Sequence, residues 1–310
     1  MSTETSRARA WLMAARPQTL PAAAAPVLVG TAFAVTDERF ALWPAIAALL
    51  GAELIQIATN FANDYFDAVK GTDTDDREGF TRVTQAGLIS AATVKRAATT
   101  TFALAFLVGI YLVYVGGLPV VIIGLASILS GVTYTGGPYP FGYYGLGDLF
   151  VFVFFGLVAV TGTYYVQAVS SVAGAFPTWV PPGTVTADVV VGSLTMAALM
   201  TAILVVNNVR DMETDAATGK ITLAVRLGYR GSRLEFVGLF ALAYLVPFYF
   251  VLARGYGIAV LLPVLSLPYA ARIVQTVRTN ESGDALNPAL ESTGKLLALY
   301  AALFAIGLVV

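Results

Sequence analysis

Residues 101–135 read TFALAFLVGIYLVYVGGLPVVIIGLASILSGVTYT, two apolar runs separated by the short segment GGLP at 116–119. Each run has the length of a helix that crosses a bilayer, because a hydrocarbon core about 30 Å thick needs roughly 20 apolar residues. Glycine and proline between two such runs mark a tight turn. The stretch therefore predicts a hairpin of two transmembrane helices, over 96–115 and 118–135.

The composition of the chain predicts more helices of this kind. Of its 310 residues, 57% are hydrophobic and 12% are charged, and the mean hydropathy is +0.76. A soluble domain carries about 25% charged residues, so this chain has too little charge for a water-facing surface. The same length rule gives seven further spans, at 18–36, 42–66, 148–169, 188–208, 234–252, 256–277 and 293–310. We therefore expect one all-α domain over 1–310, a polytopic membrane protein with nine transmembrane helices.

The distribution of Lys and Arg predicts the orientation of the chain in the membrane. With nine spans, 16 of the 18 Lys and Arg lie on one side, and Arg39 and Arg254 lie on the other. An excess of Lys and Arg is typical of cytoplasmic loops. We expect the N-terminus and two long polar loops, over 65–95 and 209–233, to be cytoplasmic. The protein would then be a multi-pass protein of the cell membrane whose chemistry takes place on the cytoplasmic face.

The absence of histidine and cysteine narrows the possible chemistry. It excludes disulfides, thiolate zinc sites, iron–sulfur clusters and histidine-ligated haem. A bound metal would have oxygen ligands, which favours a hard cation such as Mg²⁺. The net charge of −1 leaves no basic surface for nucleic acid, so DNA and RNA are not expected partners.

A polar stripe runs along the end of the second span. Its members are Glu53, Gln56, Asn60, Asn63, Asp64 and Asp67, and Lys70, Asp73 and Asp75 follow in sequence. Spacings of three and four residues place the stripe on one face of a helix. Polar groups within a span are costly unless they face a cavity or a partner, so the stripe indicates a functional site.

A second polar stripe closes the sixth span. Its members are Asn207, Asn208, Arg210, Asp211 and Asp215, and Lys220 follows. Two carboxylate clusters opposed across a central cavity would hold Mg²⁺ ions that bind a diphosphate. The nearby cations Lys70, Arg82, Arg210 and Lys220 would neutralise the remaining phosphate charge. The alternative is that these carboxylates are solvated charges at helix ends. The presence of two matching clusters argues against this interpretation.

The motifs NDYFD at 63–67 and DMETD at 211–215 resemble the two aspartate-rich motifs of the UbiA superfamily of intramembrane aromatic prenyltransferases. The resemblance covers essentially the whole chain. The stretches 14–23 (AARPQTLPAA), 134–140 (YTGGPYP) and 207–223 resemble the branch that prenylates 1,4-dihydroxy-2-naphthoate in menaquinone synthesis. One position departs from the broad family, whose first motif has a carboxylate where this chain has Gly71. The third carboxylate of the first motif is therefore open between Asp73 and Asp75.

The resemblance implies an enzyme that transfers a polyprenyl group from an allylic polyprenyl diphosphate to 1,4-dihydroxy-2-naphthoate, with loss of CO₂ and diphosphate. It implies Mg²⁺ as the cofactor, bound by the catalytic residues Asp64, Asp67, Asp211 and Asp215, and by Asp73. It implies substrate contacts for Arg16, Asn60, Asn63, Lys70, Arg82, Gln85, Tyr134, Asn207, Asn208, Arg210 and Lys220. The expected partners are the two substrates and the lipid bilayer, and the oligomeric state is left open.

Some of these residues have plain structural alternatives. Arg16 before Pro17 is also typical of a cytoplasmic anchor at a helix start. Arg82 and Gln85 also suit a solvated loop. The tyrosine cluster of Tyr134, Tyr139, Tyr143 and Tyr144 could stack on a flat ring, but tyrosine is equally common at membrane interfaces.

Two other functions stay open on the sequence. Geranylgeranylglyceryl phosphate and 4-hydroxybenzoate are alternative acceptors for the same diphosphate machinery, although the cation-free segment 134–144 favours a flat acid over a second phosphate. A membrane transporter is the alternative of a different class. Carriers have polar stripes and repeated halves, and the two stripes of this chain, with 147 residues from Asp64 to Asp211, indicate a weak internal duplication. Carriers concentrate ionisable groups near the bilayer midplane, whereas here only Glu53 and Gln56 lie deep in a span.

Overall fold

Every described element of the structure is a helix. The computed structural model describes residues 6–70, 83–135 and 141–310. The elements are α1 (Arg7–Ala15), η1 (Pro17–Thr19), α2 (Leu20–Thr36), α3 (Leu42–Lys70), α4 (Ala91–Thr135), η2 (Phe141–Tyr143), α5 (Gly147–Phe150), η3 (Val151–Val158), α6 (Ala159–Val172), α7 (Ala187–Arg210), α8 (Met212–Ala217), α9 (Leu223–Arg254), η4 (Ile258–Ser266), α10 (Leu267–Thr279) and α11 (Gly283–Val309). The predicted all-α fold class is confirmed.

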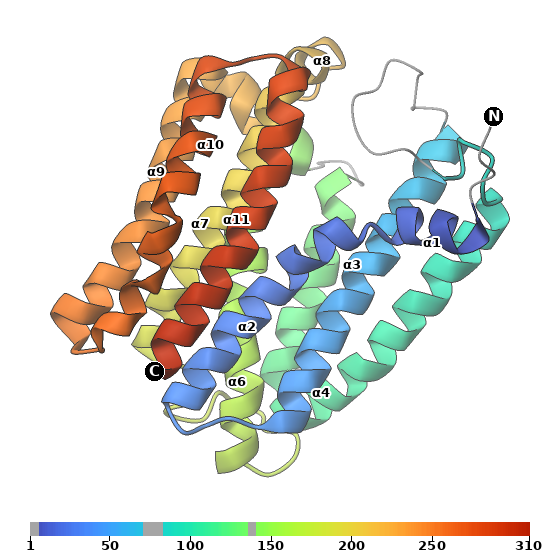
Figure 1. Cartoon of the computed structure of the whole chain (residues 1–310). Helices are drawn as coiled ribbons and strands as arrows, with labels where there is room; N and C mark the ends of the chain where they lie inside the picture. Colours follow the sequence, from blue (N-terminus) through green and yellow to red (C-terminus); the bar gives the residue numbers. More distant parts are fainter. Residues whose placement is uncertain (1–5, 71–82, 136–140) are drawn as a thin grey trace.

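Within the described residues, eight helical segments are long and apolar enough to cross a membrane. One of them belongs to α4, whose 45 residues would extend about 68 Å at 1.5 Å per residue, twice the thickness of a bilayer core. The helix is interrupted at Gly117, with φ 65° and ψ −151°, and the chain reverses direction there (Figure 1). The break lies at the turn predicted from GGLP. If each half of α4 crosses the membrane, the count is the nine that we expect.

Gly117 is required by the packing of this turn. A Cβ atom at this position would overlap the carbonyl oxygen of Pro177, and the positive φ is unfavourable for other residues. The N–H of Leu118 donates a hydrogen bond to the same carbonyl at 2.9 Å, and the N–H of Phe176 donates to the carbonyl of Tyr114 at 2.8 Å. The connection between α6 and α7 therefore packs directly on the hairpin turn.

Several helices extend beyond their predicted spans. Helix α9 begins at Leu223 rather than at 234, and its backbone leaves the helical conformation once, at Gly228 (φ 65°, ψ 178°). At the start of α9 the hydroxyl of Thr222 accepts a hydrogen bond from the N–H of Val225 at 3.3 Å. Helix α11 begins at Gly283 rather than at 293. The prediction of a long polar loop over 209–233 is wrong, because α8 and the first turns of α9 occupy most of it. Hydropathy detects the part of a helix that lies in lipid and misses charged turns that continue it.

Helix α7 is the centre of the bundle. Of its most apolar stretch 72% is buried, against 11% for α4. Gly192 of α7 lies so close to the ring of Phe33 on α2 that a Cβ would overlap that ring. Phe33 also packs against Phe250 of α9 and Phe304 of α11, with ring centroids 5.7 and 6.1 Å apart. These contacts join α2, α7, α9 and α11 into one core.

Both polar stripes lie at the same end of the bundle. Figure 1 shows α1, the C-terminal end of α3 and α8 at one end, and the C-terminus of α11 at the other. The first polar stripe lies toward the C-terminal end of α3, and the second lies at the end of α7, which α8 directly follows. The two stripes therefore end on the same side of the bundle.

Candidate active site

Asp64, in the first acidic motif, is buried near the end of α3 and is 1% exposed. Its Oδ2 accepts hydrogen bonds from the N–H and the hydroxyl of Thr84, at 3.4 and 3.3 Å. The Nη2 of Arg16 lies 3.7 Å from its Oδ1. A buried carboxylate needs such partners, because an isolated charge is costly away from water. Two segments distant in sequence therefore hold Asp64.

Arg16 is placed for this contact by an unusual backbone conformation. It ends α1 with φ 52° and ψ 66°, a left-handed conformation that costs a residue other than glycine about 1–2 kcal/mol. Pro17 then starts the next helix. Arg16 is only 8% exposed, and strained residues of this kind cluster at functional sites. The structure therefore favours a role for Arg16 at the first motif over that of a surface anchor.

Thr19 joins the N-terminal connection to the polar stripe of α3. Its hydroxyl oxygen accepts hydrogen bonds from Nδ2 of Asn60 at 2.9 Å and from Nε2 of Gln56 at 3.2 Å. The same hydroxyl donates to the carbonyl of Arg16 at 2.9 Å, and Nδ2 of Asn60 also donates to the carbonyl of Ala15 at 2.9 Å. Gln56 and Asn60 thus fix the turn that carries Arg16. The sequence patterns did not predict Thr19, whose only signal was a polar residue ahead of an apolar run.

We expect Thr19→Val to lower the free energy of unfolding by about 1–3 kcal/mol, because the buried amide of Asn60 would lose its hydroxyl acceptor. Thermal unfolding in detergent measures this. The matched control is Thr99→Val, an exposed position whose hydroxyl bonds only the carbonyl of Lys95, at 3.0 Å. That change should stay within about 0.5 kcal/mol. Equal destabilisation by the two substitutions would show that the Thr19 contacts are unimportant.

The remaining residues predicted at the first motif are less fully placed. Asn63 on α3 and Gln85 in the turn after it are exposed. Thr84, which no pattern predicted, lies beside Gln85. Other predicted positions have side chains outside the described residues, namely Asp67 and Lys70 on α3, and Asp73, Asp75 and Arg82 in the segment 71–82. The choice between the two carboxylates at 73 and 75 therefore stays open.

Asp211, in the second motif, pairs with Arg210 at the end of α7. The Nε and Nη2 of Arg210 donate to Oδ1 and Oδ2 of Asp211, at 2.7 and 2.8 Å. Nη2 also donates to Oδ1 of Asn207 at 2.9 Å, and Nη1 to Oδ1 of Asn287 at 2.9 Å. The planar guanidinium matches the carboxylate geometry. Asn207, Arg210 and Asp211 of the predicted polar face thus form one network, which Asn287 of α11 completes. Asn208 is buried at 4% exposure.

Asp215 lies on the short helix α8, four residues after Asp211. The Nζ of Lys220 donates to both of its carboxylate oxygens, at 3.1 and 3.0 Å. Gly219, with φ 78°, makes the turn that returns Lys220 to the helix. Burial raises the pKa of Asp215 above the usual range, and the Lys220 ammonium opposes this shift. A cation that the sequence predicted for diphosphate binding is thus held at the motif by Asp215.

The tyrosine-rich connection packs beside the second motif. The carbonyl of Tyr143 accepts a hydrogen bond from the N–H of Ile221 at 3.0 Å. Gly145, with φ 75°, lies against Arg226, where a Cβ would come within 2.9 Å of Nε. The side chains of Tyr143 and Tyr144 are exposed. The structure does not describe the side chain of Tyr134, which is a predicted substrate contact, and it does not describe residue 139.

The two motifs contain the donor atoms that a hard cation requires. Their oxygens come from carboxylates and amides, the ligands that Mg²⁺ prefers. Each motif has its own cations, which are Arg16 for Asp64, Arg210 for Asp211 and Lys220 for Asp215. In the part of the chain that the structure describes, no three acidic side chains lie close enough to hold a metal ion. The opposition of the two clusters across a cavity stays a prediction.

The comparison with known families decides where this chain belongs. Residues 23–290 match the model of the UbiA prenyltransferase family. The chain belongs to this family. The matched region contains both acidic motifs, and Arg16 and Thr19 lie just before it.

Several curated proteins are similar to this member of the UbiA family over nearly its full length. The 1,4-dihydroxy-2-naphthoate octaprenyltransferase of Mycobacterium tuberculosis is 39% identical over 94% of each chain. The protein of the same name from Escherichia coli is 38% identical over 98% of this chain and 96% of its own. The UbiA prenyltransferase domain-containing protein 1 of Rattus norvegicus is 31% identical over 96% of this chain and 83% of its own.

Solved structures of UbiA proteins have the same fold. A UbiA homolog from Archaeoglobus fulgidus bound to GPP and Mg²⁺ has a TM-score of 0.60, at 19% identity, over 97% of this chain and 99% of that chain. A digeranylgeranylglyceryl phosphate synthase also has a TM-score of 0.60, at 15% identity, over 98% and 99% of the two chains. At identities of 15% and 19%, the similarity to these structures is evidence of a shared fold only.

Proposed function

We propose that this protein transfers a polyprenyl group from an allylic polyprenyl diphosphate to 1,4-dihydroxy-2-naphthoate, giving demethylmenaquinol, which is the reduced form of demethylmenaquinone, together with CO₂ and diphosphate. One observation carries this proposal: the chain is 38–39% identical, over nearly its full length, to two bacterial proteins named for that reaction. The two acidic motifs at one end of the bundle (Figure 1) supply a suitable place for a diphosphate.

We infer that the acidic motifs bind Mg²⁺. From the first motif the ligands would be Asp64 and Asp67, with Asp73 or the alternative Asp75. From the second motif they would be Asp211 and Asp215. When bound, the ion would stabilise the negative charge that develops on the leaving diphosphate. The oxygen donors of the motifs support the inference, as does the Mg²⁺ in a structural relative from Archaeoglobus fulgidus.

The cations of the site have separate roles in this proposal. The guanidinium of Arg210, which already bonds Asp211 through Nε and Nη2, would contribute its positive charge to the diphosphate. Lys220 would add a point charge, and Lys70 and Arg82 would add further positive charge from the first motif. Arg16, whose turn is held by Thr19, would meet either the diphosphate or the carboxylate of the acceptor.

The transfer itself exchanges a C–O bond for a C–C bond. The allylic C–O bond breaks, and its electron pair leaves with the diphosphate. The ring carbon that bears the carboxylate then attacks the allylic cation, and the bond to CO₂ breaks so that its electron pair restores the aromatic ring. The Asn207–Arg210–Asp211 network contributes to this step by holding its donors in place before the charge develops.

A panel of acceptors tests the proposed substrate. With a radiolabelled prenyl diphosphate, we expect purified protein to prenylate 1,4-dihydroxy-2-naphthoate with release of CO₂, and to show no comparable rate with 4-hydroxybenzoate or geranylgeranylglyceryl phosphate. A phosphate acceptor would need cations of its own, and Arg210 and Lys220 are assigned to the diphosphate in this proposal. A faster rate with either alternative acceptor would contradict the proposed acceptor, 1,4-dihydroxy-2-naphthoate, but would still support prenyltransferase activity. No turnover with any acceptor would favour a transporter.

We also propose that the end of the bundle with the acidic motifs faces the cytoplasm. Single cysteines at Thr218→Cys, after α8, and Thr178→Cys, between α6 and α7, test this, because the native chain has no cysteine. Both positions are exposed. A membrane-impermeant thiol reagent on intact cells should label only the cysteine at 178. Labelling of the cysteine at 218 would contradict the proposed orientation.

A further inference from the structure

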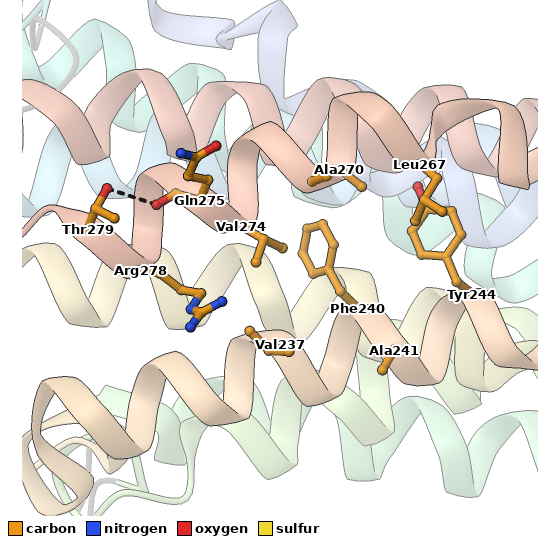
Figure 2. Close-up of a pocket in the computed structure, with 11 residues that line it drawn as sticks. Val237, Phe240, Ala241, Tyr244, Leu267, Ala270, Val274, Gln275, Arg278 and Thr279 are labelled. Atoms are coloured by element: carbon orange, nitrogen blue, oxygen red, sulfur yellow. Dashed lines mark hydrogen bonds between the residues drawn. The ribbon is translucent and has the colours of Figure 1, made fainter.

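An open groove of about 730 Å³ lies between α9 and α10 (Figure 2). Its volume is within the range of small-molecule sites, about 300–1,000 Å³. Most of its lining is apolar and comes from both helices, including Phe240 and Tyr244 of α9 and Leu267 and Val274 of α10. The polar lining residues Gln275, Arg278 and Thr279 gather at one end. The groove therefore has an apolar body and a cationic mouth.

The length of the groove corresponds to one leaflet of a bilayer. Its lining on α10 runs from Leu267 to Thr279, which is about 18 Å at 1.5 Å per residue. The hydrocarbon core is about 30 Å thick, so the groove is slightly longer than one leaflet of that core. The Thr279 end is at the side of the bundle where α8 lies (Figure 1). A ligand in the groove would enter from the leaflet on the side of the acidic motifs.

The inner end of the groove suits a hydrocarbon chain. The hydroxyls of Tyr244 and Ser266 lie 2.6 Å apart in a hydrogen bond, and Ser266 also lies 2.6 Å from the carbonyl of Pro263. The ring of Tyr244 packs on that of Tyr300, with centroids 5.3 Å apart. The polar atoms here are therefore satisfied within the protein. The inner end offers a ligand only apolar surface.

The mouth of the groove suits an anion. Arg278 is exposed, and no described carboxylate pairs with it, whereas Arg233 on the facing helix pairs with Glu281 at 3.0 Å. Gln275 lies one turn before Arg278 on the same helix. The backbone carbonyl of Gln275 accepts a hydrogen bond from the Thr279 hydroxyl at 2.9 Å. A guanidinium at the membrane surface binds phosphate oxygens well. Charge complementarity therefore favours a phosphate at this end.

We propose that this groove binds one anionic glycerophospholipid of the leaflet on the side of the acidic motifs. The phosphate lies on the guanidinium of Arg278 and the amide of Gln275. One acyl chain follows Val274 and Phe240 toward Tyr244. The lipid fills the space between α9 and α10 and links the two helices at their charged ends.

The test compares lipid retention by matched variants. Full-length protein is placed in nanodiscs of equal parts phosphatidylglycerol and phosphatidylcholine, released into detergent and weighed by native mass spectrometry. We expect the wild type to retain phosphatidylglycerol, and Arg278→Gln to retain about fivefold less, the loss expected for one basic residue at a membrane surface. Arg272→Gln, on the same helix but outside the groove lining, should retain the wild-type amount. Thermal unfolding confirms that both variants are folded.

A second variant and two competitors separate the possible occupants. Ala271→Phe, at an exposed position of the lining, should fill the groove and lower phosphatidylglycerol retention although Arg278 is intact. Neither inorganic phosphate nor geranylgeranyl diphosphate should displace the retained lipid. Equal retention of the two phospholipids by the wild type, or equal loss in Arg272→Gln and Arg278→Gln, would overturn the proposal. Displacement by geranylgeranyl diphosphate would also overturn it, because the groove would then bind the prenyl donor.

Discussion

Replacement of Asp64 or Asp211 by asparagine should lower the rate of prenyl transfer at least about a hundredfold. Each change removes one negative charge from the proposed Mg²⁺–diphosphate site, and a hundredfold corresponds to about 2.7 kcal/mol of transition-state stabilisation. Asparagine has the size of aspartate and can still accept a hydrogen bond from Thr84 or Arg210. The effect is measured as turnover of a radiolabelled prenyl diphosphate with 1,4-dihydroxy-2-naphthoate and excess Mg²⁺.

The matched control for this prediction is Asp188→Asn. Asp188 is in the first turn of α7, at the opposite end of the helix that Asp211 directly follows, and it pairs with Arg254 at 2.6 Å. Its replacement should leave turnover close to that of the wild type. Thermal unfolding should show that all three variants are folded. If the variant at 64 or at 211 kept more than half of the wild-type activity, the model of two metal-binding motifs would be wrong.

Gly117→Val should prevent the chain from reaching its native fold. A side chain there would overlap the backbone of Pro177, which cannot move aside without displacing the α6–α7 connection. The positive φ at this position adds about 1–3 kcal/mol for a residue other than glycine. Because folded proteins are stable by only about 5–15 kcal/mol, we expect the yield of monodisperse protein in detergent to fall at least tenfold, as measured by size-exclusion chromatography.

Gly109→Val serves as the comparison for this change. Gly109 is on the same helix, and a Cβ there would have no neighbour within 4 Å. The yield of this variant should be near that of the wild type, because its side chain would point into free space. A normal yield of Gly117→Val would mean that the hairpin tolerates a different turn.

The transmembrane helices of this protein could be predicted from the sequence. Helices α3 and α7 begin at Leu42 and Ala187, within one residue of the predicted starts, and the break in α4 is at the predicted GGLP turn. This succeeds because a bilayer leaves backbone groups no partner except each other, so an apolar segment of sufficient length must be a helix. The helix ends outside the lipid were predicted less well, since polar caps such as Thr222 decide them.

The chemistry of the candidate site was also readable from the sequence, because helical spacing places Asn207, Asp211 and Asp215 on one face. The spacing of residues within a helix predicts which face of the helix is polar, but it does not predict which residues pack against that face. Only the tertiary structure placed Arg16 beside Asp64 and bonded Arg210 to Asn287 of α11. These contacts join segments far apart in the chain, which no local pattern records. The sequence thus determined which groups the site contains, and the packing of the helices decided which of them meet.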